Sequence, residues 1–174
     1  AKHVFSPTDA GVFAAVSFAA KAPVFVAVLV AGMLFPKVAR LYAHGKSGSG
    51  LLQHALVLVG AISVVLTLLF LFFSAPILNL LFGPAYMMGP IIGFYTFAMG
   101  MVSIAMILLT YLLATSKHSV AFGLPLFVLA LLALLVLLHA SFVQIMLVVM
   151  LVMTALAAYA IYMAREQIDF DYFI

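Results

Sequence analysis

Charged residues are scarce in this chain of 174 residues, and cysteine is absent. Only 6% of the residues are Asp, Glu, Lys or Arg, against about a quarter in soluble domains, whereas 69% are hydrophobic. No water-soluble fold can cover that much apolar surface, so we expect an all-α integral membrane protein. The lack of cysteine excludes disulfides and thiolate metal sites. The few basic residues are spread along the chain without forming a patch, so no nucleic-acid binding is expected.

Long apolar runs separated by short polar stretches set the expected organisation of the chain. Continuous Leu, Val, Ala and Met without strict alternation favour helices over a barrel. A spanning helix needs about 20 apolar residues, because the hydrocarbon core is about 30 Å thick. The sequence predicts a single membrane domain with five transmembrane helices, over the ranges 10–35, 51–74, 90–114, 120–138 and 142–163.

The connections between these ranges differ in character. Pro36 is expected to end the first helix, and a polar, glycine-rich loop follows over 36–50. The stretch 75–89 is apolar but interrupted by Pro76 and Pro84, so we expect a connector at the membrane interface, with Tyr86 near the headgroups.

The basic residues of the connections predict the orientation. The connectors after the second and fourth expected helices hold no Lys or Arg. The basic residues lie after the first and third expected helices and in the C-terminal tail: Lys37, Arg40, Lys46, Lys117 and Arg165. Cytoplasmic loops are enriched in Lys and Arg. We therefore expect a multi-pass protein of the cytoplasmic (inner) cell membrane with a cytoplasmic C-terminus and an outer connector at 75–89.

Lys21 is the most unusual residue of the first helix. It lies about eleven residues, or about 16 Å, into the expected span and so near the bilayer midplane, where a lysine costs about 2.5–3.5 kcal/mol. Pro23 follows closely, as at the broken helices of transporters. Two interpretations stay open. Lys21 binds an anionic substrate, with Ser17 one turn away as a second substrate-binding residue, or it is neutral or paired with a carboxylate from outside the five helices, which contain none.

Small and hydroxyl residues recur on single faces of the second and third expected helices. Such stripes either line a cavity or form ordinary contacts between membrane helices. The candidate cavity-lining residues are Ser63, Thr67, Thr96 and Ser103. The range 120–138 offers only Pro125 as an interruption and is expected to face lipid.

No arrangement of residues points to catalysis, a metal or a cofactor. All five histidines fall at helix ends or in loops, without metal-ligand spacing on one helix face. Paired carboxylates within the membrane, a serine with an adjacent histidine and acid, and a phosphate-binding glycine loop are all lacking. We therefore expect neither an enzyme nor a cofactor.

Four short strings, taken in order, resemble one family. They are AGVFAA at 10–15, LFPKVAR at 34–40, LFGPAY at 81–86 and YLLATSK at 111–117. They are similar to motifs of the polysaccharide-biosynthesis flippases, the oligosaccharide flippase branch of the multidrug/oligosaccharidyl-lipid/polysaccharide exporter superfamily. Ala85 departs from the pattern, because an acidic residue is frequent there in the family.

The resemblance implies a pseudo-symmetric bundle of twelve or more helices that works by alternating access, with this chain as its C-terminal portion. The partners would then be the missing N-terminal helices, the lipid bilayer and a lipid-linked glycan. The implied function is translocation of a polyprenyl-(pyro)phosphate-linked oligosaccharide for cell-surface polysaccharide synthesis. Lys21 matches a position where basic residues are common in the family.

Two other functions stay open. One is a drug or metabolite antiporter of the same superfamily, although cation-coupled exporters usually carry carboxylates in the membrane. The other is a membrane scaffold that holds a glycan-assembly complex together without transporting.

Overall fold

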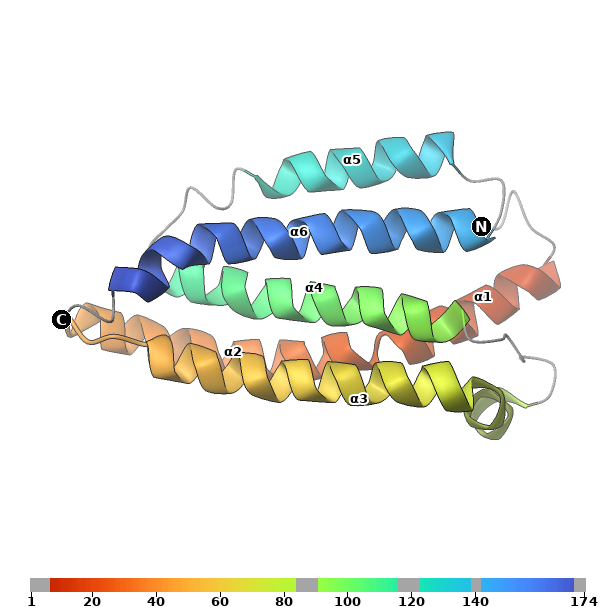
Figure 1. Cartoon of the computed structure of the whole chain (residues 1–174), viewed down its shortest axis with the longest axis horizontal. Coiled ribbons are helices and arrows are strands. Elements are labelled where there is room, and N and C mark those ends of the chain that lie inside the picture. Colours follow the sequence, from red (N-terminus) through yellow and green to blue (C-terminus); the bar gives the residue numbers. More distant parts are fainter. Residues whose placement is uncertain (1–6, 84–90, 116–122, 139–141, 171–174) are drawn as a thin grey trace.

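The computed structural model describes residues 7–83, 91–115, 123–138 and 142–170, and every regular element in these ranges is an α-helix. The six helices are α1 (Pro7–Ala20), α2 (Ala22–Ala43), α3 (Ser49–Phe82), α4 (Ile91–Ala114), α5 (Leu124–Leu137) and α6 (Phe142–Phe170). Most of them run side by side along the length of the molecule (Figure 1).

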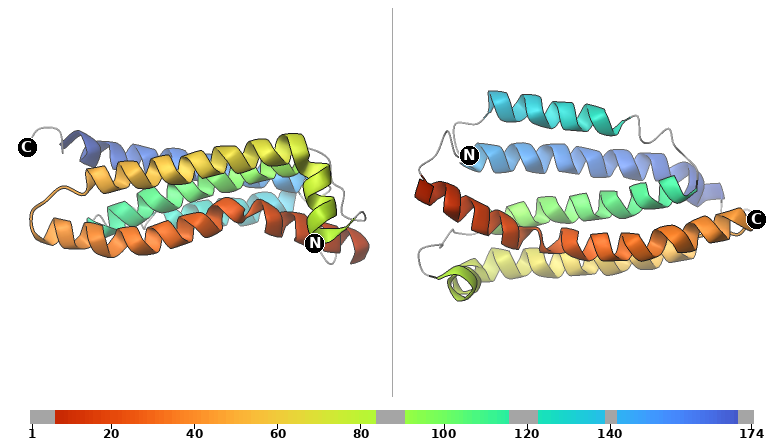
Figure 2. Two further views of the ribbon diagram at one scale, coloured as in Figure 1. Left: turned by 90° about the horizontal axis from the view of Figure 1, so that it is seen from below. Right: turned by 180° about the vertical axis from the view of Figure 1, so that it is seen from behind.

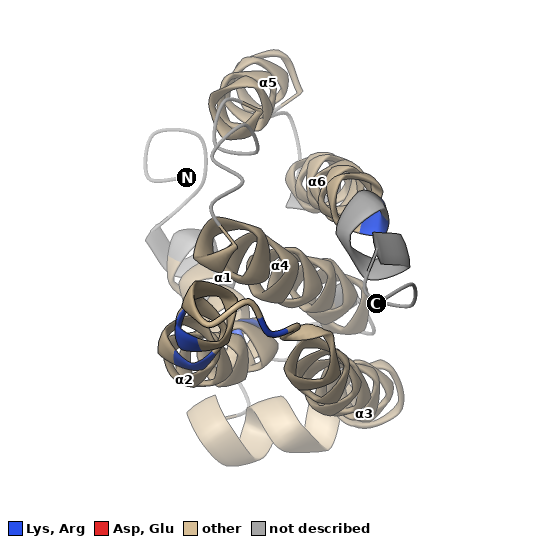
Figure 3. Cartoon of the chain, turned by 90° about the vertical axis from the view of Figure 1, so that its left-hand side faces the viewer, with Lys and Arg blue, Asp and Glu red and all other residues tan. Residues whose placement is uncertain are grey.

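The central helix of this bundle is α4. It contacts α1, α2, α3 and α6, and the end-on view places it between α2, α3 and α6 (Figure 3). The outermost helix, α5, packs against α6 and has no buried residue. A helix without a buried side is suited to contact lipid.

Four described helices are long and apolar enough to cross a membrane, so the chain is a multi-pass membrane protein. The fourth expected span is shorter than predicted in the described part of the chain. The range 120–138 contains α5, which has 14 residues, and residues 120–122 lie outside the described part. Fourteen residues extend about 21 Å, less than a hydrocarbon core of about 30 Å.

The prediction of a first helix over 10–35 is wrong in both of its bounds and in its continuity. The chain is already helical at Pro7, is interrupted at Lys21, and continues through Pro36 to Ala43. Pro36 does not end α2, because a proline inside a membrane helix is tolerated where other groups satisfy the freed carbonyl. The loop expected over 36–50 is therefore only a short turn, in which Gly45 takes a φ of +66°.

The second expected helix, 51–74, ends too early. The helix α3 runs from Ser49 to Phe82 and bends at Phe73, whose φ of −123° and ψ of 26° are not helical. The expected connector over 75–89 is thus helical as far as Phe82, and its residues 84–90, including Tyr86, lie outside the described part. The helices α4 and α6 begin within a residue of their expected starts at 90 and 142, and α6 continues beyond 163 to Phe170.

Close packing between α3 and α4 depends on two glycines. A Cβ at Gly93 would lie 2.5 Å from Leu71 Cγ, and one at Gly100 would lie 3.0 Å from Ser63 Cβ. Small residues allow membrane helices to approach closely, which gains van der Waals contact. These contacts hold the long α3 against the central helix as far as the bend.

Candidate functional site

Lys21 lies at the break between α1 and α2. Its N–H donates to the Phe18 carbonyl (3.2 Å), a bond to the third preceding residue instead of the fourth, and its own φ and ψ are −80° and 0°. Pro23 has no N–H and so cannot bond to the Ala19 carbonyl. The helix therefore restarts at Ala22, and α1 is inclined to α2 (Figure 2). The expected opening of the backbone near Lys21 is present.

The Lys21 side chain is exposed on the surface of this bundle. No Asp or Glu is among the residues whose side chains are described, so none of those pairs with it. Asp9, the acidic residue nearest in sequence, precedes it by twelve residues, about 18 Å along a helix. An ammonium group is too costly to leave in hydrocarbon, so it must reach water, a headgroup or another polar partner.

The helices are longer than predicted, so the span can also be counted from the other end of α2, which gives Lys21 a depth away from the midplane. Lys37 follows Lys21 by sixteen residues, about 24 Å along α2. With Lys37 at one edge of a core about 30 Å thick, Lys21 lies about 6 Å inside the other edge. Ala20 belongs to a buried cluster with Phe70, close to the bend of α3, which agrees with this position. From there the ammonium can reach the level of lipid phosphates.

Ser17 does not lie with Lys21. It is 8% exposed, and its side chain lies beside the Tyr95 phenol of α4. Residues four apart share a face only in a continuous α-helix. Because the helical path changes at Lys21, Ser17 faces α4 while Lys21 faces outward. Ser17 therefore belongs to the packing of α1 on α4.

The four candidate cavity-lining residues are buried within the bundle: Ser63, Thr67, Thr96 and Ser103. Three of their hydroxyls donate to the carbonyl one turn earlier on the same helix, with distances of 2.7, 2.9 and 2.8 Å for Ser63, Thr96 and Ser103. A hydroxyl bonded in this way needs no water-filled cavity. Their placement matches the second interpretation of the stripes, contact between membrane helices.

The two described histidines are His44, directly after α2, and His54, in the second turn of α3. His44 Nδ1 lies 2.7 Å from the Arg40 carbonyl, and His54 Nδ1 lies 2.6 Å from the Gly50 carbonyl. Within the described ranges, no three His, Asp or Glu side chains come together as a metal site. His3, His118 and His139 lie outside these ranges.

The other described basic residues gather at one end of the bundle, here called the basic end (Figure 3). They are Lys37, Arg40, Lys46 and Arg165, all exposed. Lys2 and Lys117 lie outside the described part. Lys21 therefore stands alone, nearer the opposite end.

No known family model, curated protein or solved structure matches this chain. The resemblance to the flippase family therefore rests on the four strings in the sequence. The class defined by the described helices is that of a multi-pass membrane protein.

Proposed function

We propose that the chain is part of a flippase that moves a polyprenyl-(pyro)phosphate-linked oligosaccharide across the cytoplasmic membrane. The observation that carries the proposal is Lys21, an exposed lysine at a helix break in an apolar bundle. A phosphate group is a suitable partner for an ammonium near the membrane interface, because a charge-assisted hydrogen bond there is stronger than in bulk water.

The concentration of basic residues at one end of the bundle supports an orientation in the membrane and hence a direction for this transport. The basic end faces the cytoplasm in this proposal, in line with the enrichment of cytoplasmic loops in Lys and Arg. Lys21 then lies near the outer leaflet, where a flipped phosphate arrives. Its role is to hold the phosphate at the outer part of the pathway while the polyprenyl chain stays in lipid.

The test measures glycan export by cells of the native host, whose export requires this protein. Lys21→Ala removes a charge-assisted contact of about 1.5–3 kcal/mol, so export falls by about 10- to 150-fold. Lys21→Arg keeps a cation and retains part of the activity. Lys46→Ala is the matched control, because Lys46 is exposed in the turn at the basic end and takes no part in the proposed contact.

Two outcomes would contradict the proposal. Full export by Lys21→Ala, with normal amounts of protein in the membrane, would mean that Lys21 only extends to ordinary headgroups. An equal loss in Lys21→Ala and Lys21→Arg, with both proteins folded, would mean that the charge is not what matters. A scaffold that does not transport predicts instead that Lys21 pairs with a carboxylate of a partner.

A further inference from the structure

The last ten residues of α3, residues 73–82, form a helical segment that turns across the end of the bundle (Figures 1 and 3). We call it the bent end of α3. Pro76 causes the bend, because it cannot donate to the Phe72 carbonyl and its ring crowds that group. Gly83 ends the segment with a φ of +93°, and its N–H donates to the Asn79 carbonyl at 2.9 Å.

The length of the straight part of α3 places the bend near the membrane surface. From Ser49 at the basic end to Phe72, the helix has 24 residues and extends about 36 Å. A hydrocarbon core is about 30 Å thick. The bend therefore falls just beyond the acyl chains, where water and headgroups can bond to the carbonyl that Pro76 leaves free.

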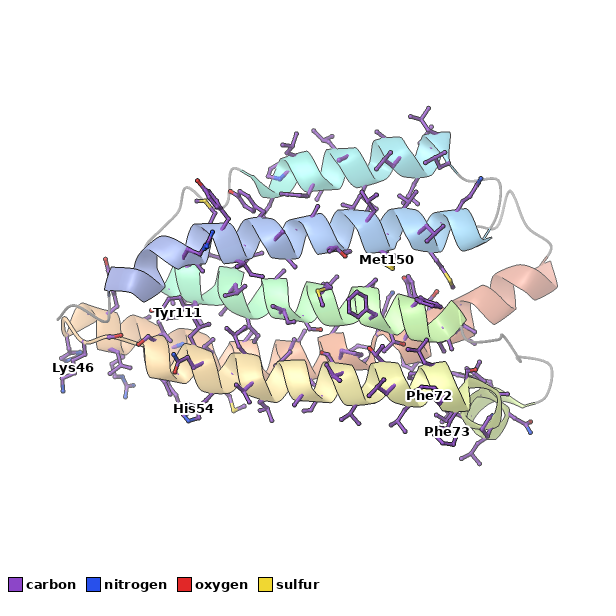
Figure 4. All side chains as sticks on the ribbon, viewed as in Figure 1. Lys46, His54, Phe72, Phe73, Tyr111 and Met150 are labelled. Carbon is purple, nitrogen blue, oxygen red and sulfur yellow. The ribbon has the colours of Figure 1, made fainter. Side chains whose placement is uncertain are left out.

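The bent end has an inner and an outer face, and large apolar side chains predominate on both, although Asn79 is also exposed. The inner face packs on the bundle: Leu78 is fully buried, and Ile77 and Phe82 are partly buried against the cluster that includes Val16 of α1. On the outer face, Leu80 is 85% exposed and Leu81 is 58% exposed. Phe72 and Phe73 lie at the bend and are also exposed (Figure 4).

The surface of the bent end continues the apolar surface of the straight part of α3. Large side chains are exposed along that part: Val57, Leu58, Val64, Val65, Leu68 and Leu69. Residues 47–83 contain no Asp, Glu, Lys or Arg, and from Ala55 to Phe82 every exposed side chain except that of Asn79 is apolar. Lipid covers the exposed side of a spanning helix. Because the exposed apolar surface continues from the straight part of α3 to Leu80 and Leu81, lipid is expected to cover these two residues as well.

We propose that the bent end of α3 lies in the headgroup–acyl boundary of the leaflet opposite the basic end, with Leu80 and Leu81 in contact with acyl chains. A helix in this position buries its apolar face about 5–10 Å below the headgroups. It thereby fixes the depth of the bundle in the bilayer. This needs only a multi-pass membrane protein and is independent of what the protein transports.

The chain contains no tryptophan, so one substitution introduces a single tryptophan, which can be excited selectively over the seven tyrosines. Leu80→Trp is reconstituted in phosphatidylcholine vesicles whose acyl chains are brominated either near the headgroup or near the chain end. The matched control is Val64→Trp, which is exposed on the straight part of α3, nearer the bilayer centre. Leu81→Trp is the second variant, and elution like that of the unsubstituted protein in detergent establishes folding.

The expected result is quenching of Leu80→Trp that is about twofold stronger with bromine near the headgroup than with bromine near the chain end. Val64→Trp shows the reverse preference. Absence of quenching by either lipid would overturn the proposal, because another polypeptide, such as a second copy, would then cover Leu80. Stronger quenching of Leu80→Trp by the deep bromines would also overturn it, because the segment would then continue into the core.

Discussion

The close approach of α3 and α4 at Gly93 gives the sharpest stability prediction. An added Cβ there would lie 2.5 and 2.6 Å from Leu71 Cγ and Cδ2 and 2.8 Å from the Leu71 backbone nitrogen, where about 3.5–4.0 Å is needed. Because one obstacle is backbone, the helices must separate. Such overpacking costs about 1–3 kcal/mol. Gly60→Ala on α3 is the control, since no atom lies within 4 Å of its added Cβ.

Comparison of the two variants isolates the steric cost, because both exchange Gly for Ala inside a helix and gain the same propensity of about 1 kcal/mol. Gly93→Ala should therefore be about 1–3 kcal/mol less stable than Gly60→Ala. At about 2–4 °C per kcal/mol, the midpoint temperatures should differ by about 2–12 °C. The assay heats the protein in detergent and measures what remains in the size-exclusion peak. A Gly93→Ala variant as stable as Gly60→Ala would refute this account of the α3–α4 contact.

Three further substitutions test other parts of the structure. Gly83→Ala should lower stability by about 1–3 kcal/mol, because a φ of +93° with a ψ of 173° strains any residue with a Cβ. Gly11→Ala is the control and should not lower stability, so equal midpoint temperatures for the two variants would contradict the backbone conformation at Gly83. Ser63→Ala should leave glycan export within about twofold of the unsubstituted protein, because its hydroxyl bonds to its own helix; a large loss of export in a stable variant would favour cavity lining. Gly123→Ala should shift the Tyr159 ring and weaken its contact with Phe127 of α5, because the added Cβ would lie 2.5 Å from Tyr159 Oη; an unchanged yield of cross-linking between positions 127 and 159 would contradict this.

The composition was enough to predict membrane helices, because burying so much apolar surface in water is impossible. It also predicted the start of α4 within one residue, since the apolar run there has no internal proline or lysine. Helix ends at prolines could not be predicted in the same way. Pro36 lies within a helix that continues, whereas Pro76 follows the bend at Phe73, and the local sequence pattern does not distinguish the two cases.

The site could be predicted only in part, because helical spacing is informative only while the helix is continuous. The break at Lys21 was indicated by Pro23. Its consequence, that Ser17 turns inward and Lys21 outward, depends on the local φ and ψ at Lys21. The predicted depth of Lys21 stays a prediction, but it was counted from a helix start that the structure places in a separate helix, α1.

The central claim is that the positive charge at position 21 meets the phosphate of the transported lipid. The chain has no cysteine, so Lys21→Cys provides a single thiol that an aminoethyl thiosulfonate converts into a side chain with an ammonium group. Export of the lipid-linked glycan by Lys21→Cys should be low, should rise several-fold after this modification, and should stay low after modification with a neutral hydroxyethyl reagent. Equal recovery with the neutral reagent, or full export before any modification, would contradict the account.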